Sequence, residues 1–65
     1  MGITIDVLVE YNLESGKKIV IERNENNSIH IHYGHTRLNL SEENFERLCM
    51  NIKKSADILR DIKGL

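Results

Sequence analysis

Residues 29–48 of this chain read IHIHYGHTRLNLSEENFERL, and two different periodicities meet in this segment. Apolar and polar residues alternate over 29–33 and again over 36–40, while Gly34 and His35 separate the two runs. Two runs of period two around a two-residue break predict a β-hairpin, and glycine at the first central position favours a type II′ turn.

The predicted hairpin has one self-consistent register. A one-residue slip would move every apolar side chain to the opposite face, so the pattern of the two runs specifies the pairing. The expected partners are Tyr33 with Thr36, His32 with Arg37, Ile31 with Leu38, His30 with Asn39, and Ile29 with Leu40. Apolar pairs then share one face of the hairpin and polar pairs share the other.

Towards the N-terminus, the pattern predicts two further strands, over 3–13 and 18–23. Gly16 lies in the turn between them, and the asparagine-rich segment 24–28 is expected to be a loop. In the first strand the odd-numbered residues are expected to form one buried face. These residues are Ile3, Ile5, Val7, Val9, Tyr11 and Leu13.

Downstream of the hairpin, the sequence predicts a single helix over 42–63. Ser41 is a favourable N-cap, acidic residues fill the first turn, and Gly64 is suited to the C′ position. The helix carries an apolar stripe that is expected to cover the sheet, which places the only cysteine in the core. The helix stripe consists of Phe45, Leu48, Cys49, Ile52, Ala56 and Leu59.

The length of this helix exceeds what the second hairpin can cover. A helix of 22 residues is about 33 Å long, whereas a five-residue strand spans about 17 Å. Near the C-terminus Ile58, Ile62 and Leu65 lie to one side of the helix stripe, and we expect them to contact a second copy of the chain. Association of this kind is common for small domains, because 65 residues bury little apolar surface.

Together these elements predict one domain, residues 1–65, of the α+β class. Its sheet is a four-stranded antiparallel meander built from two hairpins, and the C-terminal helix packs on one face of that sheet.

The composition favours some classes of protein over others. The formal net charge is −1 and both signs are dispersed, so a basic surface for nucleic acid is not expected. A lone cysteine excludes an internal disulfide framework. No segment is long and apolar enough to span a bilayer and no signal peptide is apparent, which leads to the expectation of a cytoplasmic protein.

The polar face of the second hairpin is the best candidate for a binding site. It combines His30, His32, Arg37 and Asn39, and Glu22 of the preceding strand is expected beside them. Arg37 and the histidines could bind an anion or another small ligand. Alternatively, His30 and His32 could share a metal ion with Glu22, or with His35 of the turn. A partner protein or plain solvation of the face are the other readings of this pattern.

A catalytic site is not expected. Cys49 and the histidines are predicted on opposite sides of the sheet, so they cannot form a nucleophile and its base. The carboxylates Asp6, Glu10 and Glu22 have no predicted pocket around them. The sequence therefore favours a non-enzymatic interaction module without a cofactor, which acts as a homodimer and binds another macromolecule.

Overall fold

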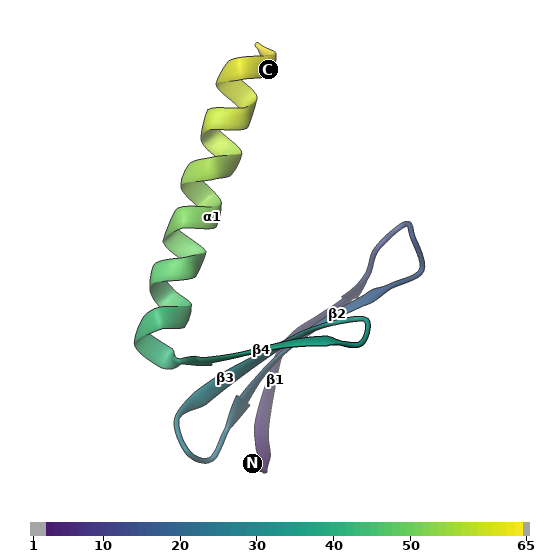
Figure 1. Ribbon diagram of the computed structural model, residues 1–65, viewed down its shortest axis with the longest axis vertical. Helices are drawn as coiled ribbons and strands as arrows, with labels where there is room; N and C mark the ends of the chain where they lie inside the picture. The colour runs from purple at the N-terminus through teal and green to yellow at the C-terminus, as the bar shows by residue number, and fades with distance from the viewer. Residues whose placement is uncertain (1–2, 65) are drawn as a thin grey trace.

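The computed structural model describes residues 3–64 and contains four strands and one helix (Figure 1). The elements are β1 (Thr4–Asn12), β2 (Lys18–Asn24), β3 (Ser28–Tyr33), β4 (Thr36–Ser41) and α1 (Glu42–Lys63). The strands form one antiparallel sheet in the order β1-β2-β3-β4. The predicted α+β meander with one C-terminal helix is confirmed, and strand ends differ from the predicted ones by a single residue.

The second hairpin has the predicted register at all five expected pairs, from Tyr33 with Thr36 to Ile29 with Leu40. Gly34 has a φ of 59°, whereas His35 does not have a positive φ. A positive φ at the first central position alone is what a type II′ turn requires. Local turn chemistry and the alternating pattern therefore specify the same pairing.

The ends of α1 also follow from local sequence. The Ser41 hydroxyl accepts a hydrogen bond of 3.1 Å from the Asn44 backbone N–H, which satisfies one of the free donors of the first turn. Gly64 ends the helix in the left-handed conformation, with a φ of 73°. Ser41 is thus both the last residue of β4 and the N-cap of α1, so no loop separates sheet from helix.

Strand β1 differs from the prediction because it is irregular. Its pairing with β2 shifts register twice, between Thr4 and Asp6 and again between Val7 and Val9. Each extra residue in a bulge reverses the alternation of the strand. The expectation that all odd-numbered residues of 3–13 share one buried face is therefore wrong, and every residue of β1 is exposed.

Between the two bulges, the side chains of β1 lie on the opposite faces from those that strict alternation predicts. Val7 lies opposite Glu22, and Asp6 lies opposite Arg23. Arg23 donates two hydrogen bonds to Asp6 Oδ2, at 2.9 Å from Nε and 2.7 Å from Nη2. The exposed ion pair thus joins the first two strands on the face that alternation predicts to be apolar.

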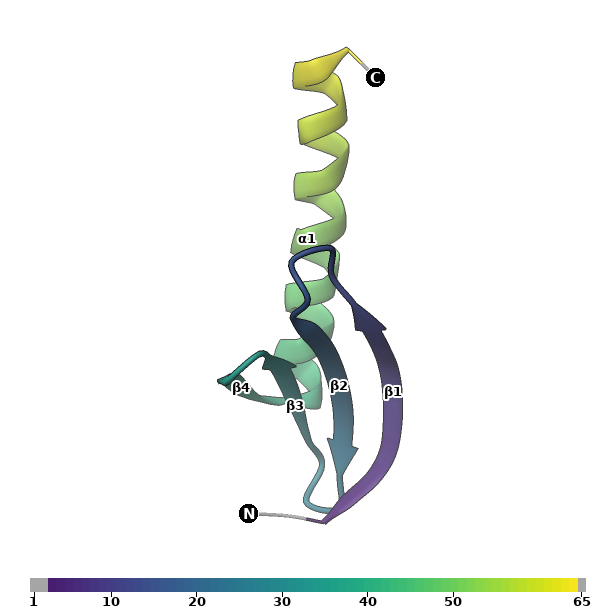
Figure 2. The same cartoon turned by 90° about the vertical axis from the view of Figure 1, so that its right-hand side faces the viewer.

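Helix α1 packs on the second hairpin and then leaves the sheet (Figures 1 and 2). It contacts β4 and β3, and its half-buried apolar residues Phe45 and Leu48 lie in its first two turns. Ile29 is the one buried apolar residue of the described chain, with 2% of its surface exposed. A smaller part of α1 therefore lies on the sheet than the lengths of helix and strands alone predict.

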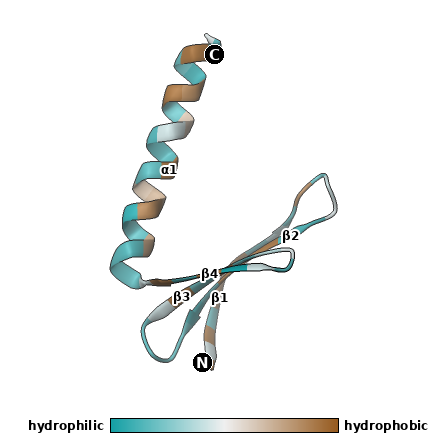
Figure 3. Cartoon of the chain, viewed as in Figure 1, coloured by the Kyte–Doolittle hydropathy of each residue, from teal (hydrophilic) through white to brown (hydrophobic). Residues whose placement is uncertain are grey.

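The rest of the helix stripe is not covered. Figure 3 shows that hydrophobic residues recur along α1 beyond the part that meets the sheet. Cys49, Ile52 and Leu59 are exposed. The expectation of a buried Cys49 is wrong for the single chain, because the axis of α1 diverges from the sheet after the first turns. Within residues 3–64, no helix combines the length and the apolar character needed to cross a membrane.

Candidate functional site

Cross-strand pairing gathers polar residues from the two central strands and β4 on one face of the sheet. Residues directly opposite each other in adjacent strands project to the same face. One row consists of Val7, Glu22, His30 and Asn39, and the next consists of Glu10, Val20, His32 and Arg37. These two rows are called the histidine face below, and the opposite face, with Ile21, Ile29, Ile31, Leu38 and Leu40, is called the apolar face.

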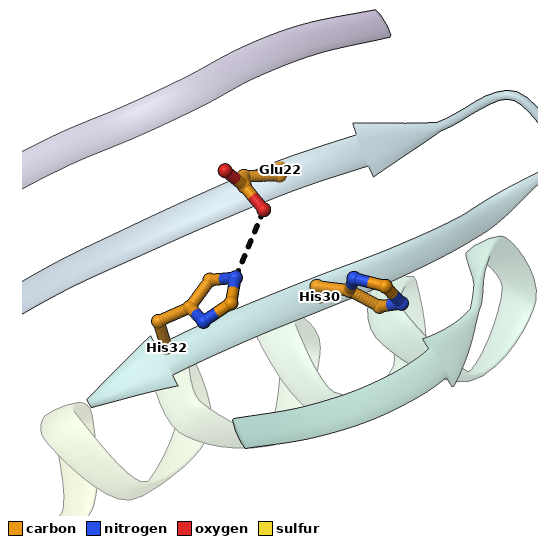
Figure 4. A group of neighbouring side chains, drawn as sticks. All are labelled: Glu22, His30 and His32. Carbon is orange, nitrogen blue, oxygen red and sulfur yellow. Dashed lines mark hydrogen bonds and ion pairs between the residues drawn. The ribbon is translucent and has the colours of Figure 1, made fainter. Parts of the chain in front are cut away.

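Glu22, His30 and His32 form a compact cluster on this face (Figure 4). The His32 Nε2 and Glu22 Oε1 atoms are 2.9 Å apart. The centroids of the two imidazole rings are 6.2 Å apart, and the rings are nearly perpendicular. Each residue offers one potential ligand atom, and these three atoms lie within 4.8 Å of one another.

His30 is the most enclosed member of the cluster. Only 7% of its surface is exposed, whereas His32 and Glu22 are half-buried. Across residues 3–64, no hydrogen bond to a His30 ring nitrogen is present, while His32 is paired with Glu22. Among the described residues, Asn24 Nδ2 is the fully buried side-chain polar atom without a partner, so the ring nitrogens of His30 keep some solvent contact and no protein group occupies them.

The other predicted site residues lie on β4 or in the turn that precedes it. Asn39 lies directly across from His30, and Arg37 lies across from His32, as predicted. Both residues are exposed. His35 is in the turn after β3 and is not part of the cluster. Glu22 and His35 were the two alternatives for a third metal ligand, and Glu22 is the one that lies beside His30 and His32.

The position of Glu22 decides which charge the centre of the site favours. Its carboxylate is within hydrogen-bonding distance of His32 and directly opposite His30. A bound anion at the two imidazoles would be repelled by this carboxylate, whereas a cation would be attracted to it. The only side chain with a fixed positive charge in these two rows is Arg37, which lies at the exposed margin.

Sequence reasoning did not single out Asn24, which was expected in a loop. The structure places it at the end of β2, opposite Thr4 and only 1% exposed. Its Oδ1 accepts a hydrogen bond of 3.3 Å from Thr4 Oγ1, and its Nδ2 has no partner. No pattern in the sequence distinguishes this asparagine from its exposed neighbours, since its burial follows from the pairing of β1 with β2.

Two of the residues predicted to contact a second copy of the chain lie in the C-terminal half of α1, which does not contact the sheet. Ile58 and Ile62 are both exposed, and Ile62 is 77% exposed. Leu65, the third residue of that set, lies outside the described residues. The C-terminal half of α1 therefore has apolar side chains that no other part of the described chain covers.

Comparison of the chain with models of protein families, with curated proteins and with solved structures finds no match.

Proposed function

We propose that this protein is a non-enzymatic interaction module that acts as a homodimer. The observation that supports the proposal is the unusual amount of apolar surface that a single chain leaves exposed. Exposed apolar patches larger than a few hundred Å² are typical of sites of protein association. In this proposal the dimer is also the unit that binds any further macromolecule.

The exposed surface of the chain is too large for a compact monomer. It measures 5373 Å², whereas a compact monomer of 7.5 kDa is expected to expose about 4,200 Å². The excess is about 1,100 Å², compared with about 800 Å² that each partner buries in a standard protein interface. The radius of gyration, 13.8 Å, likewise exceeds the roughly 11 Å expected for a compact domain of this length.

A second copy of the chain is the partner that best fits this surface. The helix stripe has the spacing of a helix that covers a sheet, whereas α1 contacts only β3 and β4, so no helix lies over the part of the apolar face that β1 and β2 form. Because Ser41 joins β4 to α1 without a loop, the start of α1 is fixed at the end of β4, and the helix contacts only β3 and β4 of its own sheet. The same stripe from another copy is free of that constraint.

A two-fold arrangement uses both surfaces at once. In an isologous dimer each chain presents the same patch, so the helix stripe of one copy lies on the apolar face of the other, and the reverse. Both unpartnered surfaces are then covered by one symmetric contact. The dimer thus supplies the core that a single chain, with Ile29 as its buried apolar residue, does not have.

Sedimentation equilibrium at micromolar concentrations tests the proposal. We expect the mass of two chains for the wild type and dissociation for Ile52→Glu and Ile62→Glu, since a charge would be buried at the interface without a partner. Each of these variants should raise the dissociation constant more than tenfold. Met50→Glu is the matched control, because Met50 is 72% exposed but lies apart from the helix stripe and from the adjoining group to which Ile62 belongs.

Two results would contradict the proposal. One is a wild-type protein that sediments as a folded monomer throughout the micromolar range. The other is a Met50→Glu variant that dissociates as readily as Ile52→Glu, because that result would show a general response to added charge instead of an interface on the helix stripe.

A further inference from the structure

We infer that Glu22, His30 and His32 bind a divalent transition metal ion, with Zn²⁺ as the ion that best suits them. This site is on the histidine face, and it is independent of the proposed dimer. Two imidazoles and one carboxylate are a common set of protein ligands for zinc, and a water molecule fills the fourth position in sites of this composition.

The three side chains converge without help from a loop. Glu22 is directly opposite His30, and His32 follows His30 at the next position on the same face of β3. Strands β2 and β3 are the two inner strands of the sheet, so each is held on both sides by backbone hydrogen bonds. A site supported by inner strands is held more rigidly than one on a loop.

The spacing of the ligand atoms is close to that of a metal site. Ligands about 2.0–2.2 Å from a tetrahedral zinc ion are roughly 3.3–3.5 Å from one another. The candidate atoms are all within 4.8 Å of one another, and His32 Nε2 and Glu22 Oε1 are 2.9 Å apart. The differences from ideal spacing are about 1.5 Å or less, which is within the reach of side-chain rotation.

The hydrogen bond between Glu22 and His32 is compatible with this site. When the Nε2 of neutral His32 carries the proton, it donates to the Glu22 carboxylate. In the other tautomer the proton is on Nδ1, and the Nε2 lone pair is free to bind a metal ion that lies between the ring and the carboxylate. The ion then occupies the place of the shared proton.

His30 offers an imidazole whose nitrogens are not used by any protein group of the described residues. Only 7% of the surface of His30 is exposed, and its ring makes no hydrogen bond within residues 3–64. Its ring nitrogens are not among the fully buried unpaired atoms of the described residues, so they keep solvent contact and a ligand can reach them. Since Glu22 is the charged group opposite His30, the favoured ligand is a cation.

The charged neighbours do not compete for the same position. Lys18 is paired with Glu10, with 3.0 Å between Nζ and Oε2. Arg37 is exposed at the margin of the face, on the far side of His32 from Glu22. Its side chain can extend into solvent and keep its charge away from the ion.

Isothermal titration with ZnCl₂ on the full chain tests the inference. We expect one Zn²⁺ per chain, and at least a tenfold weaker affinity for each of Glu22→Gln, His30→Asn and His32→Gln. His35→Gln is the matched control, because it removes an exposed histidine one turn away and should leave the affinity unchanged. Amide NMR spectra of each variant show whether the fold is retained.

A second measurement keeps the test decisive if a variant does not fold. In the wild-type protein, zinc should shift the ring signals of His30 and His32 and leave those of His35 in place. Zinc affinity that is equal in wild type and His32→Gln, or that falls equally in His35→Gln, would overturn the inference. Sedimentation in the presence of a chelator distinguishes this site from the dimer, which should persist without zinc.

Discussion

At the scale of single residues, burial in this protein is concentrated on very few side chains. Ile29 is the buried apolar residue of the described chain, in β3, which α1 contacts, and opposite the half-buried Leu40. Most other large apolar side chains are exposed in the single chain. The stability of the contact between sheet and helix should therefore depend strongly on this one isoleucine.

Truncation of Ile29 tests this dependence. We expect Ile29→Ala to lower the free energy of unfolding by about 2–5 kcal/mol, since it removes buried methyl groups and leaves a cavity. The same truncation at the exposed Ile3 should change it by no more than about 0.5 kcal/mol. Denaturant unfolding followed by circular dichroism compares the two. Equal effects would show that Ile29 is not a distinct core residue in solution.

At the scale of elements, the sequence predicts the regular parts and not the irregular ones. The second hairpin has strict alternation, a suitable turn and an adjacent N-cap, so local signals agree and its register could be predicted pair by pair. Strand β1 has the same alternation, yet its two bulges arise from pairing with β2, which period alone does not encode. The cluster of Glu22 with the histidines was predictable because it depends on the regular strands.

The direction of α1 is the element-scale feature that periodicity could not predict. The helix stripe indicates that the helix covers an apolar surface, and it does not say to which chain that surface belongs. Cys49 illustrates the ambiguity, because it is on the helix stripe and exposed in the single chain. Ser41 connects α1 directly to the end of β4, so the direction of the helix is set by tertiary geometry at this junction, which periodicity does not encode.

Labelling of the Cys49 thiol tests which surface the helix stripe meets. We expect the rate of reaction with a thiol reagent to fall as protein concentration rises through the range of dimer formation, because the partner covers the stripe. Ile52→Glu, which should remain monomeric, should react rapidly at every concentration. A wild-type dimer whose Cys49 reacts as rapidly as that of the variant would place the interface elsewhere on the chain.

At the scale of the whole molecule, folding and association are expected to be one process. The single chain has a small core, and in the proposed dimer a further part of its exposed apolar surface is buried by the partner. The histidine face lies on the opposite side of the sheet from this apolar surface, so a metal ion and a partner chain can be bound at the same time. The two proposals therefore have separate consequences for stability.

This coupling predicts that thermal stability depends on protein concentration. For a dimer that unfolds to two free chains, each tenfold increase in concentration stabilises the folded state by about 1.4 kcal/mol of dimer. The midpoint of thermal unfolding should therefore rise steadily with concentration, and zinc at a fixed concentration should add an increment that is lost in His32→Gln. Differential scanning calorimetry over a hundredfold range of concentration measures both effects. A midpoint that does not change over this range would show that the single chain is stable by itself, and the exposed helix stripe would then need another explanation.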